Sequence, residues 1–128
     1  MRLLIDTAVA LWVADDAPHL SPMARSLIAD PENEVVLSVV TPWEVAIKSA
    51  LAKLDVPRDL GGYFGRMLAA LSMTVLPIEL RHGLAVRELP HIHADPFDRL
   101  LIVQAQIEGL TLVTPDTVIA RYDVETAW

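Results

Sequence analysis

The 128-residue sequence contains no cysteine and is short of basic side chains. Without cysteine there can be no disulfide scaffold, zinc ribbon, iron–sulfur site or thiol chemistry, and a reducing compartment is the natural setting. The 10 Lys and Arg are outnumbered by 17 Asp and Glu, which gives a net charge of −7. This balance argues against a protein that holds nucleic acid by a general basic field.

Long hydrophobic runs are absent as well, because no stretch of about 20 apolar residues is free of charge. We therefore predict no membrane span, and a cytoplasmic protein. What the chain does have is a hydrophobic fraction of 53%, which is enough to bury a core and excludes disorder. The length, with no linker, repeat or charge run, suits one domain over residues 1–128.

The apolar pattern alternates between the period of strands and the period of helices. Helical patterns separate most of the strand-like segments, which predicts a mostly parallel sheet of four to five strands in a three-layer α/β/α sandwich. The predicted strands cover residues 2–6, 34–39, 73–76, 111–114 and 122–124.

Two predicted helices start alike, with TPWE at 41–44 and DPFD at 95–98. The first is expected to extend to about Leu54 and the second to Glu108, with Gly109 as its C-terminal stop. If Thr41 and Asp95 cap these helices, Glu44 and Asp98 both occupy the third helical position. Two further acids, Asp6 and Asp116, follow predicted strands. Strand ends and the starts of the following helices share the carboxyl edge of a parallel sheet, where such sheets bind ligands. These four acids are therefore expected to converge.

Four carboxylates in one pocket repel each other, and helix N-termini offset only part of that repulsion. A hard divalent cation would offset far more, and a ligand set made of oxygen alone favours Mg²⁺ or Mn²⁺ over zinc. Such an ion binds phosphate oxygens and activates water, which is the chemistry of phosphodiester hydrolysis.

A purely structural interpretation exists for each acid. Thr-x-x-Glu is a capping box that stabilises a helix by about 1 kcal/mol without any catalysis. Asp95 and Asp98 suit an ordinary helix start, and Asp6 and Asp116 suit turns. Capping does not explain why two strands also end in Asp at the same edge.

The sequence resembles the PIN domain, and more closely the VapC toxins of bacterial toxin–antitoxin pairs. The most specific part is the DPFDRLLIVQAQ run with the following LVTPD. The resemblance extends over four segments: LLIDT at 3–7, SVVTPWEVAIKSALAKL at 38–54, LPHIHADPFDRLLIVQAQIEGLTLVTPD at 89–116 and YDVETAW at 122–128.

The resemblance implies roles for particular residues. It makes Asp6, Glu44 and Asp98 the metal-binding acids, and Asp116 the fourth, more variable acid. The hydroxyls that lie beside the acids in the family correspond to Thr7 and Thr114. Relatives often carry His where this chain has Ala8, a departure that leaves the acids intact.

The resemblance also implies an activity and partners. It implies a Mg²⁺- or Mn²⁺-dependent endoribonuclease that cuts RNA through a metal-activated water. A cognate antitoxin that occupies the active-site groove and a homodimer are implied as well.

Several polar residues near the acids remain open to two interpretations. For His91 and His93, a loop role that orients Asp95 or Asp98 is favoured over metal ligation, because no third nitrogen or sulfur ligand lies nearby. Lys48 pairs with Glu44 at helical spacing or meets an RNA phosphate. Arg99, placed beside the acids, contacts phosphate or a local carboxylate. The three tryptophans are expected in the core.

Other function classes make different demands on the sequence. A receiver-like signalling domain needs adjacent acids after the first strand and a late lysine, but Asp6 stands alone and Lys53 is the last lysine. A phosphatase of the haloacid dehalogenase type needs a second acid two residues after Asp6. A catalytically silent binding module that keeps the acids for capping stays possible, and metal binding would separate it from a nuclease.

Overall fold

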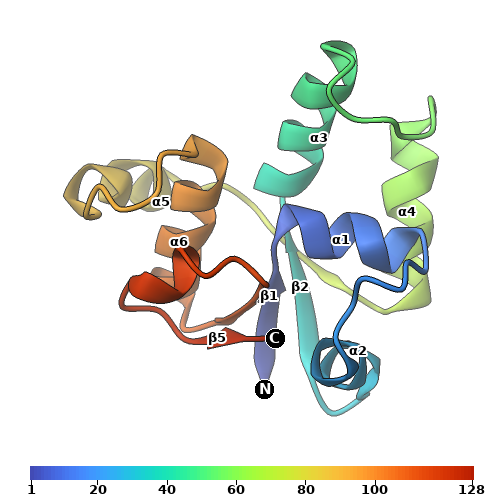
Figure 1. The fold of residues 1–128 in the computed structure, drawn as a ribbon, viewed down its shortest axis with the longest axis horizontal. Coiled ribbons are helices and arrows are strands. Elements are labelled where there is room, and N and C mark those ends of the chain that lie inside the picture. The colour runs from blue at the N-terminus through green and yellow to red at the C-terminus, as the bar shows by residue number, and fades with distance from the viewer.

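The computed structural model describes residues 1–128 and has one parallel sheet at its centre (Figure 1). The strand order is β3-β2-β1-β4-β5, and every neighbouring pair is parallel. This confirms the predicted fold class, with five strands. The strands are β1 Arg2–Ile5, β2 Glu34–Ser38, β3 Thr74–Leu76, β4 Thr111–Val113 and β5 Thr126–Ala127.

Six α-helices cover the sheet and its carboxyl edge, with two short 3₁₀ turns. Figure 1 shows α1 and α4 on one side of β1, and α5 and α6 on the other. None of the helices combines the length and apolar character that crossing a membrane requires. The helices are α1 Thr7–Ala14, α2 Pro22–Ala29, α3 Val40–Ala50, α4 Leu60–Ala70, α5 Leu80–Ala85 and α6 Pro96–Glu108, with η1 Val86–Glu88 and η2 Ile119–Arg121.

Alternation along β1 divides the core in two. Leu3 and Ile5 point into the core shared with α1, α2 and α4, whereas Leu4 points into the core shared with α6. All three side chains are fully buried, which is why this segment is continuously apolar. Asp6 follows as the first polar residue, at the edge where the buried surface ends.

Helix α3 begins earlier than predicted, because the Ser38 hydroxyl accepts a hydrogen bond from Val40 N at 3.0 Å. Thr41 therefore lies inside the helix, and the predicted capping box between Thr41 and Glu44 is wrong. The helix also ends at Ala50 rather than near Leu54, and Ala52 takes a left-handed φ of 55°.

Helix α6 starts and ends as predicted. The Asp95 carboxylate caps it by accepting from Phe97 N at 2.8 Å, and Gly109 ends it with a φ of 66°. The last strand is Thr126–Ala127 rather than residues 122–124, because Tyr122 is buried in the α6 core instead. The core prediction is also wrong for Trp43, whose side chain is 49% exposed.

Candidate active site

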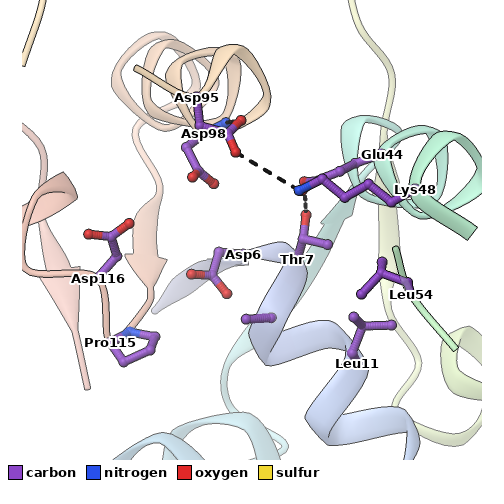
Figure 2. A pocket seen from close by; sticks show the side chains of 11 residues that line it. Asp6, Thr7, Leu11, Glu44, Lys48, Leu54, Asp95, Asp98, Pro115 and Asp116 are labelled. Carbon is purple, nitrogen blue, oxygen red and sulfur yellow. Dashed lines mark hydrogen bonds and ion pairs between the residues drawn. The ribbon is translucent and has the colours of Figure 1, made fainter. Parts of the chain in front are cut away.

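A cavity of about 320 Å³ opens at the carboxyl edge of the sheet (Figure 2). Five carboxylates and a single cation, Lys48, line it together with small and apolar side chains. The lining residues are Asp6, Thr7, Ala8, Leu11, Glu44, Lys48, Leu54, Asp95, Asp98, Pro115 and Asp116. The structure thus brings all four predicted acids to one pocket, although they are spread over most of the chain.

Asp6 is held between β1 and α1 by both of its carboxylate oxygens. Oδ1 accepts from Val9 N at 2.8 Å, which makes Asp6 the N-cap of α1. Oδ2 accepts from the hydroxyl of Thr114, which follows β4. The side chain is 5% exposed, so these contacts orient it firmly.

Glu44 enters the pocket from the second turn of α3 and is 4% exposed. Its Oε1 accepts from Thr7 Oγ1 at 2.7 Å, and its Oε2 is paired with Lys48 Nζ. Thr7 Oγ1 also lies 3.2 Å from the hydroxyl of Thr41. The buried hydroxyls of Thr7 and Thr114 therefore each fix one acid.

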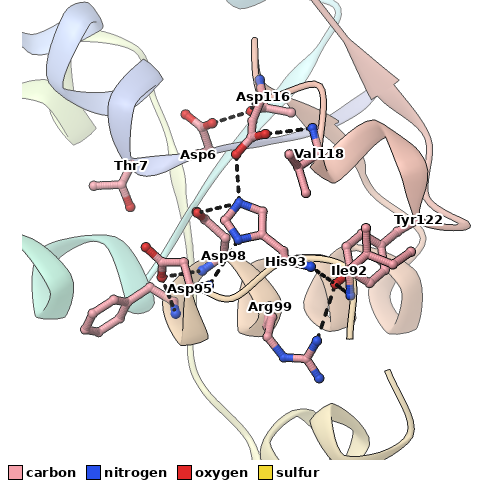
Figure 3. A network of polar contacts seen from close by, with 12 residues as sticks. Asp6, Thr7, Ile92, His93, Asp95, Asp98, Arg99, Asp116, Val118 and Tyr122 are labelled. Atoms are coloured by element: carbon pink, nitrogen blue, oxygen red, sulfur yellow. Dashed lines mark hydrogen bonds and ion pairs between the residues drawn. The ribbon is translucent and has the colours of Figure 1, made fainter. Parts of the chain in front are cut away.

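The remaining acids come from α6 and from the segment after β4. Asp98 lies in the first turn of α6, where its backbone N donates to Asp95 Oδ1 at 3.3 Å. Asp116 accepts from Val118 N at 2.8 Å through Oδ1 and from His93 Nε2 at 2.8 Å through Oδ2. His93 Nε2 also lies 3.3 Å from Asp98 Oδ2 (Figure 3).

The pKa values of the pocket carboxylates reflect their burial and the presence of only one cation, Lys48, beside them. Burial raises the pKa of Asp6 to about 6, despite the hydrogen bond from Thr114, and the nearby Asp116 and Glu44 charges add to the rise. Burial and the charge of Asp95 raise the pKa of Asp98 to about 7. For Asp116 the rise due to burial is outweighed, chiefly by the hydrogen bond to His93, and its pKa is lowered.

These shifts predict that the metal-free protein loses stability as pH rises. An ordinary Asp has a pKa of 3.8, so between about pH 4 and pH 7 the native state keeps protons that the unfolded chain has lost. The free energy of unfolding therefore falls through this window. We expect the Tm in EDTA to be roughly 5 °C higher at pH 5 than at pH 8, measured by thermal unfolding.

Substitutions separate this effect from the general charge of the protein. Asp98→Asn removes the group with the larger shift and should flatten the profile, whereas Asp55→Asn, at an exposed position, removes the same charge and should not. An equal flattening in both variants would mean that the pocket is not the source. The pKa of Asp116 is shifted in the opposite direction, but a lowered pKa changes the free energy of unfolding only below this pH window.

The donor set suits a hard divalent cation. The converging ligand atoms are carboxylate oxygens, which Mg²⁺ and Mn²⁺ prefer, and no sulfur is present. The pKa values of Asp6 and Asp98 are raised chiefly by burial and further by the charges of neighbouring acids, and a bound cation would offset both effects. The carboxylates of Asp98 and Asp116 and the ring of His93 place ligand-type atoms within 4.8 Å of one another.

Arg99 corrects the sequence interpretation. It contacts neither the pocket nor a carboxylate, is 7% exposed, and donates to three backbone carbonyls and to the Tyr122 hydroxyl. The carbonyls belong to Pro90, Leu89 and Val86. Arg99 therefore supports the loop that leads to α6 rather than meeting RNA or metal.

The link between His93 and Asp116 is the feature that sequence reasoning missed. The sequence predicts that His93 orients Asp95 or Asp98, and the structure adds Asp116, 23 residues further along the chain. The available signal was the loop position of His93 just before the capping Asp95. His91, by contrast, is exposed.

Comparison with protein families gives one match over most of the chain. The family model of the PIN domain matches residues 3–125. Among curated proteins, none matches the sequence.

Solved structures show the same fold at low sequence identity. VapBC2 from Rickettsia felis, bound to a DNA fragment from its promoter, matches with a TM-score of 0.72 and 14% identity, covering 99% of this chain and 98% of the other. FitAcB from Neisseria gonorrhoeae gives 0.63 and 17%, covering 97% and 95%. VapBC-5 from Mycobacterium tuberculosis gives 0.60 and 17%, covering 98% and 95%. At these identities the likeness shows the fold alone.

Proposed function

Because the chain belongs to the PIN domain family, we propose that it is a metal-dependent endoribonuclease and the toxin of a toxin–antitoxin pair. The observation that carries the proposal is the convergence of four carboxylates, from four separate segments, in one pocket at the carboxyl edge. Capping accounts for Asp95 and for one oxygen of Asp6, but not for Glu44, whose predicted capping box does not form.

In this proposal Asp6, Glu44, Asp98 and Asp116 would hold Mg²⁺ or Mn²⁺. When bound, such an ion would neutralise phosphate charge and would supply a water of lowered pKa as the nucleophile for phosphodiester hydrolysis. The hydroxyls of Thr7 and Thr114 keep Glu44 and Asp6 in place before any ligand arrives. This preorganisation saves the reorganisation that flexible acids would need.

Lys48 supplies the only positive charge among the residues that line the pocket. The hydrogen bond to Glu44 is the main cause of a raised pKa for Lys48, so the ammonium stays charged. Its Nζ lies 4.0 Å from Asp95 Oδ2 and 5.6 Å from the centre of the Phe97 ring. We infer that this ammonium meets a phosphate of the RNA, since a net charge of −7 leaves few other basic groups for that task.

The proposed partners are a cognate antitoxin and a second copy of the chain. Two of the similar structures pair VapB with VapC or FitA with FitB, and one of them carries promoter DNA. Apolar side chains are exposed on α3, at its C-cap and on α5, with Trp43 at 49%, Leu51 at 61% and Leu80 at 79%. Such faces suit protein contacts, and the molar mass in solution, by light scattering, tests the homodimer.

The setting and extent of the activity follow from the substrate and the fold. Cellular RNA places the proposed toxin in the cytoplasm. Both hydrophobic clusters pack on the same five-stranded sheet, which supports residues 1–128 acting as a single PIN domain.

The direct test is RNA cleavage by the purified protein. Single-stranded RNA should be cut internally with Mg²⁺ or Mn²⁺, and EDTA should stop the reaction. Isothermal titration measures ion binding without RNA. A protein that binds neither ion at millimolar concentration would be the silent binding module instead.

A further inference from the structure

The loop between η1 and α6 is held by the side chains of Tyr122 and Arg99 (Figure 3). The Tyr122 hydroxyl accepts from Ile92 N at 3.0 Å and from His93 N at 2.6 Å, and it donates to Pro90 O at 2.8 Å. Arg99 donates to Pro90 O at 2.8 Å. The backbone at His93 is therefore fixed independently of its imidazole ring.

The imidazole of His93 has a defined tautomer. Its Nδ1 accepts a hydrogen bond from Asp95 N at 3.1 Å, which requires a lone pair on that nitrogen. The ring proton must then reside on Nε2, which faces Asp116 Oδ2 at 2.8 Å and Asp98 Oδ2 at 3.3 Å. An Nε2 that carries a proton and donates it to carboxylate has no lone pair to offer a metal.

His93 is the only side chain that contacts the carboxylates of both Asp98 and Asp116. These acids come from different elements, α6 and the segment after β4. Asp116 has one further anchor, the backbone N–H of Val118 at 2.8 Å, whereas the Asp98 carboxylate accepts no hydrogen bond and has His93 Nε2 as its nearest donor group, at 3.3 Å. The relative orientation of the two acids therefore depends on the ring.

We propose that His93 is a positioning residue of the acidic site, whose Nε2–H is hydrogen-bonded to the Asp116 carboxylate and faces the Asp98 carboxylate at 3.3 Å, so that it orients these acids for a divalent cation, and that it is not itself a metal ligand. The proposal rests on the proposed function in assigning these acids to the metal. Groups that orient metal ligands in this way commonly change metal affinity by 10- to 100-fold when they are removed.

Two substitutions of His93 distinguish the effect of the Nε2 donor from that of the rest of the imidazole ring. In His93→Gln the amide nitrogen reaches the region of Nε2 and can still donate, whereas the shorter side chain of His93→Asn reaches only the region of Nδ1. We expect His93→Asn to weaken Mn²⁺ binding roughly tenfold or more, and His93→Gln to recover most of the affinity. Isothermal titration of the metal-free full chain measures both. His91→Asn, at an exposed position in the same loop, is the matched control and should leave the affinity unchanged.

Spectroscopy tests the same claim without RNA cleavage. In the metal-free protein, ¹⁵N NMR of His93 should show a protonated Nε2 and an unprotonated Nδ1 that accepts a hydrogen bond. Pulsed EPR of the Mn²⁺ complex should show no directly bound histidine nitrogen. A ¹⁴N coupling that shows a histidine nitrogen bound directly to Mn²⁺ would overturn the proposal. So would an equal loss of Mn²⁺ affinity in His93→Gln and His93→Asn.

The outcomes of these experiments also distinguish the proposed role of His93 from the proposed nuclease activity. Mn²⁺ binding with the expected difference between Gln and Asn supports the role of His93 even if the wild-type protein cuts no RNA. RNA cleavage by the wild type with no effect of either substitution on Mn²⁺ affinity overturns the role of His93 alone.

Discussion

Asp98→Asn is expected to reduce metal-dependent RNA cleavage by about a thousandfold. Asn keeps the size of the side chain but removes the charge and the anionic oxygen, the property that a hard divalent cation requires. Losing about 4 kcal/mol of transition-state stabilisation, a reasonable share of what such an ion supplies, corresponds to that factor. The initial rate of cleavage of a fluorogenic single-stranded RNA, with saturating Mg²⁺ or Mn²⁺, measures it.

Misfolding is not expected to explain the loss. Asp98 has a raised pKa because its charged form is disfavoured in the native state, so the neutral Asn should raise the Tm of the metal-free protein at pH 8. Asp55→Asn removes one exposed charge and should keep the full rate. An Asp98→Asn variant that retains a tenth of the wild-type rate would show that the metal-binding acids have been assigned incorrectly.

The convergence of the acids was predictable because it depends on topology and not on detail. Once the strands are parallel, the ends of β1 and β4 and the start of α6 share one edge, whatever the exact boundaries are. The cap at Asp95 and the stop at Gly109 were predictable for a similar reason, since each is a local backbone requirement that few residue types meet.

The roles of individual polar side chains were less predictable, because they depend on contacts distant in sequence. The start of α3 moved because Ser38, at the end of a strand, accepts from Val40 N, which left Glu44 free to contact Thr7. His93 meets Asp116 from a loop whose backbone is held by the hydroxyl of Tyr122. The residues that flank Ser38 and His93 in the sequence do not indicate these hydrogen-bond partners.

Arg99 shows the same limit most clearly. An arginine directly after a site acid suggests a phosphate contact, but one helical step turns its side chain by about 100° away from that of Asp98. The guanidinium is buried beneath the loop, where its planar set of donors serves several carbonyl groups at once. The sequence does not show those carbonyls, because the loop that presents them is irregular.

Removal of the Arg99 guanidinium is expected to cause the largest loss of stability. Arg99→Met keeps much of the apolar stem but leaves the carbonyls of Pro90, Leu89 and Val86 without this donor. Leu89 O is then left unpaired, at a cost of about 1–3 kcal/mol, whereas Pro90 O keeps the Tyr122 hydroxyl and Val86 O keeps Leu89 N. Because the hydrogen bonds from a charged donor to Pro90 O and Val86 O are lost as well, we expect the free energy of unfolding to fall by roughly 3 kcal/mol. Urea unfolding at equilibrium, in EDTA, measures the change.

The control is an arginine whose guanidinium lies in solvent. Arg81 has a side chain that is 54% exposed and pairs with Glu79 and Glu108, so Arg81→Met should cost less than about 1 kcal/mol. Arg99→Lys should restore little, because one ammonium cannot replace a planar fork that reaches three carbonyls. If Arg99→Met instead kept its stability and only weakened RNA binding, Arg99 would be the phosphate contact that its place beside Asp98 first suggested. The loss of stability expected here would place Arg99 beneath the loop, where it supports the position of His93 and, through it, the spacing of the acids.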